Sequence, residues 1–249
     1  MTIPIKTEKE IQIMRKNGKN LAGIMEKISK KVAPGVKSQE LNELAEKLII
    51  ELDAKPSFKN YNGFPAALCV SINEEIVHGT PYNKTLKHGD IVSLDLGIYK
   101  NGFHSDMAIT LPVGEISYEA KHLIKTTKKA LKLAIRNIKT SNTFGDISNI
   151  IQRHIESQGH SVVRELCGHG IGRKLHEDPE ILNYGKRRTG PKIKQGMVFC
   201  IEPMAAIGKG EIKKGKDCCA YTTIDKTLSA HFEHTIAVTK KGAEILTKI

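Results

Sequence analysis

Two aspartates flank a turn signal and are the first residues whose spacing could do chemistry. Asn101-Gly102 is typical of a two-residue hairpin loop, because both residue types tolerate the positive φ angles of a type I′ turn. Such a loop pairs Gly97 with Asp106, which makes Asp95 and Asp106 diagonal neighbours about 7–8 Å apart on one face. Two carboxylates at this spacing can bind one cation or a pair. The alternative is a surface strand with two solvated aspartates, which the hairpin alone leaves open.

Three further segments each offer one metal-binding side chain. His169 lies among glycines, where the backbone can approach a ligand closely and a neutral imidazole is a natural metal ligand. Glu202 ends an apolar strand directly before a proline, which removes a backbone donor. Glu233 shares one face of a strand with His231 and Thr235. Each segment has a plainer alternative: a turn with an incidental histidine, a buried ion pair to a lysine, and a half-exposed strand.

Together these side chains indicate a metallohydrolase. Carboxylates with one imidazole suit hard or borderline divalent ions such as Co, Mn, Fe or Zn. Two ions about 3.5–4 Å apart can share a water molecule and activate it. The candidate ligands are Asp95, Asp106, His169, Glu202 and Glu233.

The apolar periodicity predicts the elements that carry these residues. Helices are expected over residues 8–31, after an N-cap at Ser38, over 117–138 and over 146–158. Strands are expected over 66–72, 90–98, 103–111, 161–166, 197–202 and 231–239. No linker rich in Ser, Pro or Gly divides the chain, so residues 1–249 are expected to form a single α+β domain.

The composition narrows the class of protein. A chain of 249 residues with 39% hydrophobic and 27% charged residues fits a globular protein. It has no apolar run of signal-peptide or membrane-span length, so we expect a cytoplasmic protein without a membrane partner. Its five cysteines form no disulfide framework pattern. The net charge of +12 could mark a ribosome or RNA surface, but scattered lysines favour a solvated surface without specific DNA binding.

Five ordered segments resemble type I methionine aminopeptidases, a bacterial-type group of the M24 metallopeptidases. They are VSINEEIVHGTP (70–81), DIVSLDLGIYKNGFHSD (90–106), CGHGIGRKLHEDP (167–179), FCIEPM (199–204) and SAHFEHTIAVT (229–239). The resemblance spans the whole chain and implies a pita-bread fold, with two pseudo-symmetric halves whose antiparallel sheet is covered by helices. It implies removal of the N-terminal methionine of nascent peptides when the second residue is small. We also expect a monomer.

The resemblance also implies a role for each metal-binding residue. Asp95 would bind one of two divalent ions through two oxygens. Asp106 and Glu233 would bridge both ions, and His169 and Glu202 would complete the shell of the other. A bridging water or hydroxide would be the nucleophile, with Glu202 as its proton shuttle.

Two histidines and an apolar pocket complete the implied site. His176 would donate a hydrogen bond to the scissile carbonyl or its oxyanion, and His78 would contact the scissile amide nitrogen. The methionine side chain would bind among Tyr61, Phe64, Cys69 and Leu175.

The chain departs from the family pattern at a few positions. Relatives commonly have Trp where this chain, which has none, has Cys219 beside Cys218. Leu166 stands where an aromatic residue or Met is commoner, and His231 replaces the usual Gln. These departures bear on substrate preference and turnover rather than on the reaction class.

Two other readings remain open. Proline-specific aminopeptidases and prolidases share the fold, but they usually carry a separate N-terminal domain for which this chain has no room. Non-catalytic peptide-binding relatives also share the fold, but they typically lose ligands that are all present here.

Overall fold

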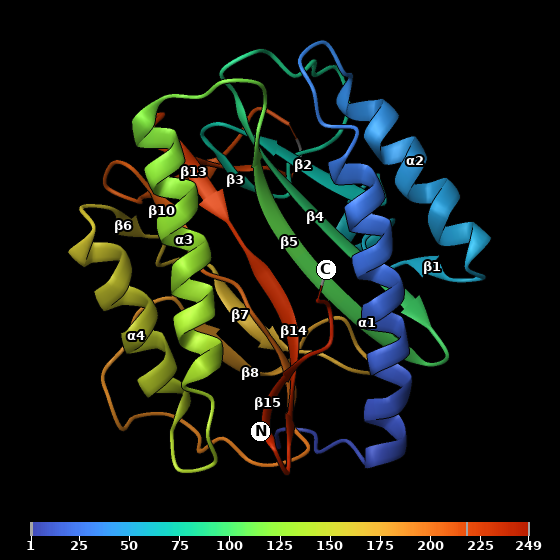
Figure 1. Ribbon diagram of the computed structural model, residues 1–249, viewed down its shortest axis with the longest axis vertical. Coiled ribbons are helices and arrows are strands. Elements are labelled where there is room, and N and C mark those ends of the chain that lie inside the picture. The colour runs from blue at the N-terminus through green and yellow to red at the C-terminus, as the bar shows by residue number, and fades with distance from the viewer. Residues whose placement is uncertain (1, 218, 249) are drawn as a thin grey trace.

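The computed structural model describes residues 2–217 and 219–248 and has an α+β architecture (Figure 1). Its helices are α1 (Glu8–Ser29), α2 (Ser38–Glu51), α3 (Tyr118–Arg136) and α4 (Phe144–Ser157), with a short 3-10 turn at Tyr61–Gly63. The strands of the main antiparallel sheet are β1 (Lys55–Pro56), β2 (Leu68–Ile72), β4 (Ile91–Lys100), β5 (Phe103–Pro112), β7 (Cys167–Gly170), β8 (Glu177–Leu182), β9 (Val198–Ile201), β14 (Glu233–Thr239) and β15 (Gly242–Ile245).

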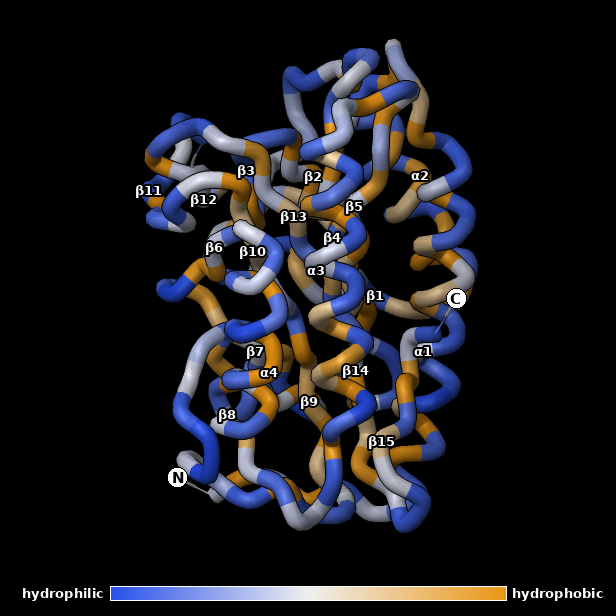
Figure 2. Tube along the Cα trace, turned by 60° about the vertical axis from the view of Figure 1, so that its left-hand side comes forward, coloured by the Kyte–Doolittle hydropathy of each residue, from blue (hydrophilic) through white to orange (hydrophobic). Residues whose placement is uncertain are grey.

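The order of the main sheet is β1-β4-β5-β14-β9-β7-β8, with β2 beside β4 and β15 beside β14. Two smaller sheets flank it. One joins β6 (Ser161–Val162), β10 (Met204–Ala206) and β13 (Ser229–His231), and the other joins β3 (Glu75–Val77), β11 (Ile212–Lys214) and β12 (Tyr221–Thr223). Figure 2 shows β11 and β12 at one side of the molecule, next to β3.

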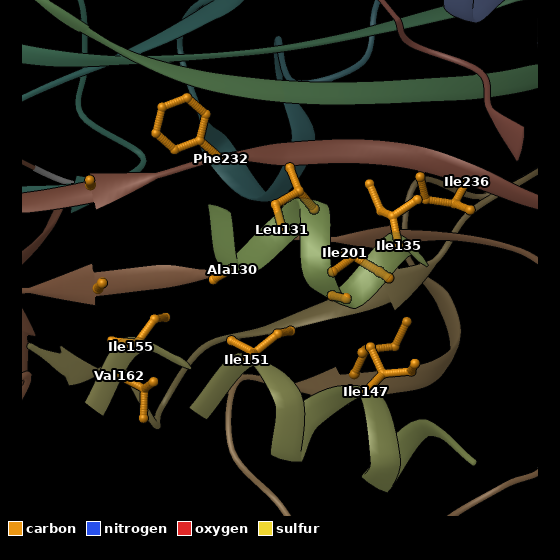
Figure 3. Packing of buried hydrophobic residues seen from close by; sticks show 14 of the residues in the cluster. Ala130, Leu131, Ile135, Ile147, Ile151, Ile155, Val162, Ile201, Phe232 and Ile236 are labelled. Atoms are coloured by element: carbon orange, nitrogen blue, oxygen red, sulfur yellow. The ribbon is translucent and has the colours of Figure 1, made fainter. Parts of the chain in front are cut away.

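Two apolar clusters attach the helices to one face of the sheet. One packs α1 and α2 against β2, β4 and β5. The other packs α3 and α4 against β9 and β14, where Leu131 and Ile135 of α3 lie close to Ile201 and Ile236 (Figure 3). Burial of these stripes supplies most of the stability of amphipathic helices. None of the helices in the described ranges is long and apolar enough to cross a membrane.

The hairpin predicted around Asn101-Gly102 is confirmed. Lys100 pairs with Phe103 and Gly97 pairs with Asp106, and Asn101 and Gly102 have φ angles of 52° and 83°. The turn therefore sets the register that brings Asp95 and Asp106 onto one face.

Most expected boundaries shift by one or two residues, and three larger differences have a structural cause. Ser38 is the first residue of α2 rather than its N-cap, and its hydroxyl donates to the carbonyls of Pro81 and Lys84 instead. The strand expected over 161–166 is only two residues long, because only Ala205 and Ala206 of β10 pair with it.

The strand expected over 231–239 is interrupted at Phe232, where the chain passes from the small sheet to the main one. The facing chain passes between the same sheets at Glu202-Pro203, so both interruptions lie at one place. The sequence predicted no strand at most of the short elements, whose residues pair only because tertiary neighbours are present.

The first helix approaches the C-terminal segment closely at Gly18. A Cβ atom added there would lie 2.4 Å from the carbonyl oxygen of Leu246, whereas one at Gly23, in the same helix, would meet nothing within 4 Å. We expect Gly18→Ala to lower the free energy of unfolding by about 1–3 kcal/mol through overpacking. The matched variant Gly23→Ala should raise it by up to about 1 kcal/mol through helix propensity. Urea unfolding of both variants measures this, and equal effects would contradict the close approach.

Candidate metal centre

Three adjacent strands bring three carboxylates onto the sheet face that points away from the helices. On β4, Leu94 and Leu96 pack toward α1 and α2, so Asp95 between them points to the opposite face. Ala108 of β5 lies between Asp95 of β4 and Glu233 of β14 in one row across the strands. Because the methyl group of Ala108 is small, the longer side chains around it can converge. Asp106, two residues before Ala108 on β5, completes the group: the candidate ligand atoms of Asp95, Asp106 and Glu233 lie within 4.8 Å of one another.

His169 and Glu202 close this group from the other half of the sheet. The Nε2 atom of His169 lies 3.6 Å from Oε1 of Glu202. Nδ1 of His169 lies 2.9 Å from the carbonyl oxygen of Gly170. A carbonyl only accepts, so the ring proton is on Nδ1 and the Nε2 lone pair is free to bind a cation.

The glycines beside His169 allow its strand to fit between its neighbours. A Cβ atom at Gly168 would lie 2.4 Å from the carbonyl oxygen of Cys200, and one at Gly170 would lie 2.0 Å from that of Asp178. Only glycine avoids these collisions, so β7 can lie this close to β9 and β8. The glycines on either side of His169 thus allow its strand to place this side chain at the centre.

The burial of these carboxylates tests whether the site fits a cation. Asp95, Asp106 and Glu233 are 8%, 3% and 2% exposed. One buried oxygen of each has no hydrogen-bond partner within the described residues. A buried polar atom without a partner is costly, and a bound cation would satisfy all three at once. The oxygen-rich set with one imidazole fits divalent ions such as Mn, Fe, Co or Zn.

The pKa values of these carboxyl groups in the protein without cations also indicate a cation site. Burial raises the pKa of Asp106 to about 7 and that of Glu202 to about 8. Burial, together with the neighbouring carboxylates, also raises the pKa of Asp95 and Glu233 well above the ordinary range. Like charges this close disfavour full ionisation of the group. Positive charge at the centre would remove this penalty.

The centre forms the floor of a cavity of about 1100 Å³. Every residue that the sequence nominated for the site lines this cavity: the five candidate ligands and His78, His176, Tyr61, Phe64, Cys69 and Leu175. Phe64, Cys69 and Leu175 are buried and belong to one apolar cluster, whereas Tyr61 is 38% exposed at the rim. Cys219 also lines the cavity, and Cys218 lies outside the described residues.

The two cavity histidines are held in different ways. Nδ1 of His176 lies 2.8 Å from the hydroxyl of Tyr61, and its ring meets that of His169 edge to face. His78 has a φ of 59°, an uncommon conformation for a residue with a Cβ, of the kind that recurs at functional sites. Burial lowers the pKa of His78 to about 4 and also lowers the pKa of His176. Both rings are therefore neutral near pH 7 and can donate or accept a hydrogen bond.

Sequence reasoning missed two features of the site. Lys6 and Glu177 form a buried ion pair of 2.5 Å directly beside His176, and Thr2, Pro4 and Ile5 help to line the cavity. No periodic pattern marks the N-terminal segment, so nothing in the sequence links it to the cavity. The second feature is His231, whose ring faces Glu202 and Glu233. The alternation of His231 with Glu233 is visible in the sequence, but this pattern alone does not mark His231 as part of a site.

The protein without metal should lose stability as pH rises from 6.5 to about 8. Burial lowers the pKa of His169 and His231 to about 3, so the stability they contribute is complete once pH exceeds 6.5. The pKa values of Asp106 and Glu202 are raised, to about 7 and 8, so these two groups change the stability with pH in the opposite direction. Their contribution is present below the ordinary carboxyl range and is lost as pH rises through the folded values. Melting temperatures measured in chelator check this.

Glu202→Gln should flatten that pH dependence, whereas Glu51→Gln on the exposed end of α2 should leave it unchanged. A melting temperature that stays constant or rises over this pH range would contradict the electrostatic picture.

Comparison with known proteins agrees with this geometry. The model of metallopeptidase family M24 matches residues 12–240. The chain is 48% identical over 247 residues to a methionine aminopeptidase of Clostridium perfringens, covering 99% of each sequence. The crystal structure of a methionine aminopeptidase from Thermotoga maritima matches with a TM-score of 0.98 and 43% identity, over 100% of both chains.

A prolidase from Pyrococcus furiosus shares the fold at a TM-score of 0.81 and 25% identity, but only 65% of that longer chain is covered. The pita-bread fold expected from the sequence is thus confirmed. By sequence and by fold, the chain belongs to metallopeptidase family M24, among its methionine aminopeptidases.

Proposed function

We propose that this protein is a metal-dependent aminopeptidase that removes the N-terminal methionine from nascent peptides whose second residue is small. The observation that carries the proposal is the convergence of Asp95, Asp106, His169, Glu202 and Glu233 on the floor of one cavity beside an apolar recess. The names of relatives 48% and 43% identical over nearly the full length support it. We propose that residues 1–249 act as one catalytic domain.

The five side chains would hold two divalent ions. Asp95 would help to hold one ion, His169 and Glu202 would help to hold the other, and Asp106 and Glu233 would contribute to both. When bound, the ions would supply the positive charge that makes a nucleophilic water available near neutral pH. The donor set suits Co, Mn, Fe or Zn, and availability in the cell decides among them.

Glu202 is placed to move protons during hydrolysis. Its carboxylate lies beside the centre, with Oε1 3.6 Å from Nε2 of His169 and Oε2 3.5 Å from Nε2 of His231. It would take a proton from the attacking water and return it to the amine that leaves when the peptide bond breaks.

The two neutral histidines would bind the peptide group. With the Tyr61 hydroxyl donating to Nδ1 of His176, the ring keeps its proton on Nε2 and can donate it to the scissile carbonyl oxygen. His78 would contact the scissile amide nitrogen and orient the bond. The methionine side chain, which is unbranched and polarisable, would fill the recess among Tyr61, Phe64, Cys69 and Leu175.

Release of methionine from Met-Ala-Ser tests the function. We expect metal-loaded protein to release methionine, chelator to abolish the release, and an Xaa-Pro dipeptide to remain intact. Glu202→Gln serves as the control that removes the proton acceptor while preserving shape, and it should lower turnover by about 100-fold or more. Well-folded, metal-loaded protein that releases no methionine would overturn the proposal. Near-normal turnover of Glu202→Gln would overturn only the role given to that residue.

The same assay tests the alternative that the protein is a prolidase, which has weaker support. The prolidase that shares this fold is much longer than this chain, which covers 65% of it. Cleavage of the Xaa-Pro dipeptide without cleavage of Met-Ala-Ser would favour that alternative. Failure to cleave either peptide while binding both would favour a peptide-binding relative.

We also propose that the protein works as a monomer in the cytoplasm, where nascent chains are made, and docks on the ribosome through its basic surface. The net charge of +12 motivates the docking, since such a surface attracts RNA and the attraction weakens with salt. Co-sedimentation with ribosomes should therefore occur at low salt and be lost at high salt. Sedimentation that is absent at low salt, or unaffected by salt, would argue against docking by charge.

A further inference from the structure

One buried imidazole at the centre has no role in the five-residue ligand set. His231, the last residue of β13, is 1% exposed. Its Nε2 atom lies 3.5 Å from Oε2 of Glu202 and 3.9 Å from Oε2 of Glu233. Neither ring nitrogen has a hydrogen-bond partner within the part of the chain that the structure describes.

The backbone of His231 is held by Thr110 of the neighbouring strand β5. The amide of His231 donates to Oγ1 of Thr110 at 2.9 Å, and the same hydroxyl donates to the carbonyl of His231 at 2.8 Å. Because the single hydroxyl proton of Thr110 goes to that carbonyl, Ser93 must donate in the 2.8 Å contact between the two hydroxyls. These bonds therefore fix the backbone of His231 beside the centre, and the ring lies next to Glu202 and Glu233.

The distances do not satisfy the ring by hydrogen bonding. A separation of 3.5 Å from Glu202 is beyond the range of a good N–H···O bond, so a buried donor and acceptor are left unpaired at a cost. The candidate ligand atoms of Glu202, His231 and Glu233 lie within 4.8 Å of one another. A cation between them would give the imidazole lone pair a partner and would neutralise the carboxylates.

We propose that His231 is a sixth ligand of the metal centre and binds, through Nε2, the ion that His169 and Glu202 hold. The inference deepens the proposed function and rests on its assignment of metals. With two imidazoles, this position would favour Zn, Co or Fe over Mn more strongly than a position with one. The glutamine that is usual at this place in the family offers an amide, which is a weaker ligand for such ions.

Metal titration of the full-length protein tests the proposal without relying on activity. Zn²⁺ or Co²⁺ is added to chelator-treated protein and followed by calorimetry, and by visible absorption for Co²⁺. In His231→Gln we expect one of two binding steps to weaken by about tenfold or more, with a changed Co²⁺ absorption band. His234→Gln, the same change on the opposite face of the next strand, should leave both steps unaltered, since His234 faces Thr247 instead.

A second measurement uses the unmodified sequence and so does not depend on how a variant folds. Among ten histidines labelled with ¹⁵N, two should show metal-bound nitrogen shifts when Zn²⁺ is added, His169 and His231. A single shifted histidine, together with unaltered titrations of His231→Gln, would overturn the proposal. Two shifted histidines in a protein that releases no methionine would keep the ligand and overturn the proposed function.

Discussion

The mutual repulsion of buried carboxylates is the constraint on which this structure depends. Asp95, Asp106 and Glu233 are almost fully buried, Glu202 lies beside them, and burial raises the pKa of all four. At low effective dielectric, full ionisation of such a group is unfavourable without compensating charge. The fold therefore has to hold the carboxylates together against a force that cations would reverse. Stability, metal binding and the proposed chemistry are aspects of one electrostatic arrangement.

Small residues in the sheet make that arrangement sterically possible. Ala108 separates Asp95 from Glu233 without filling the space between them, and Gly168 and Gly170 let β7 approach its neighbours. On the other face, larger apolar side chains pack against four helices. Because successive side chains of a strand point to opposite faces, one face of the sheet stabilises the fold by burying apolar side chains, and the other face carries the ionisable groups.

The rim of the cavity depends on residues far from the centre in sequence. Loop residues Leu175 and His176 stand beside Glu177, which the buried amine of Lys6 holds from the N-terminal segment. Arg173 in the same loop pairs with Glu10 of α1 and lies over the ring of Phe103. The loop that would contact the substrate is therefore held by α1 and by the N-terminal segment before it, as well as by the sheet that carries the candidate metal ligands.

The sequence by itself determined the hairpin register, because Asn101-Gly102 dictates the turn and strand periodicity then places Asp95 and Asp106 together. It also determined the four helices, since their apolar stripes are local signals. Only the tertiary structure decided how the hairpin and the helices come together with the other strands. Contacts between residues distant along the chain make the rest. They are the row from Asp95 through Ala108 to Glu233, the change of sheets at Phe232, the Lys6–Glu177 pair and the approach of the His231 ring to Glu202. Such contacts are set by packing and by the pairing of strands, which no local pattern encodes.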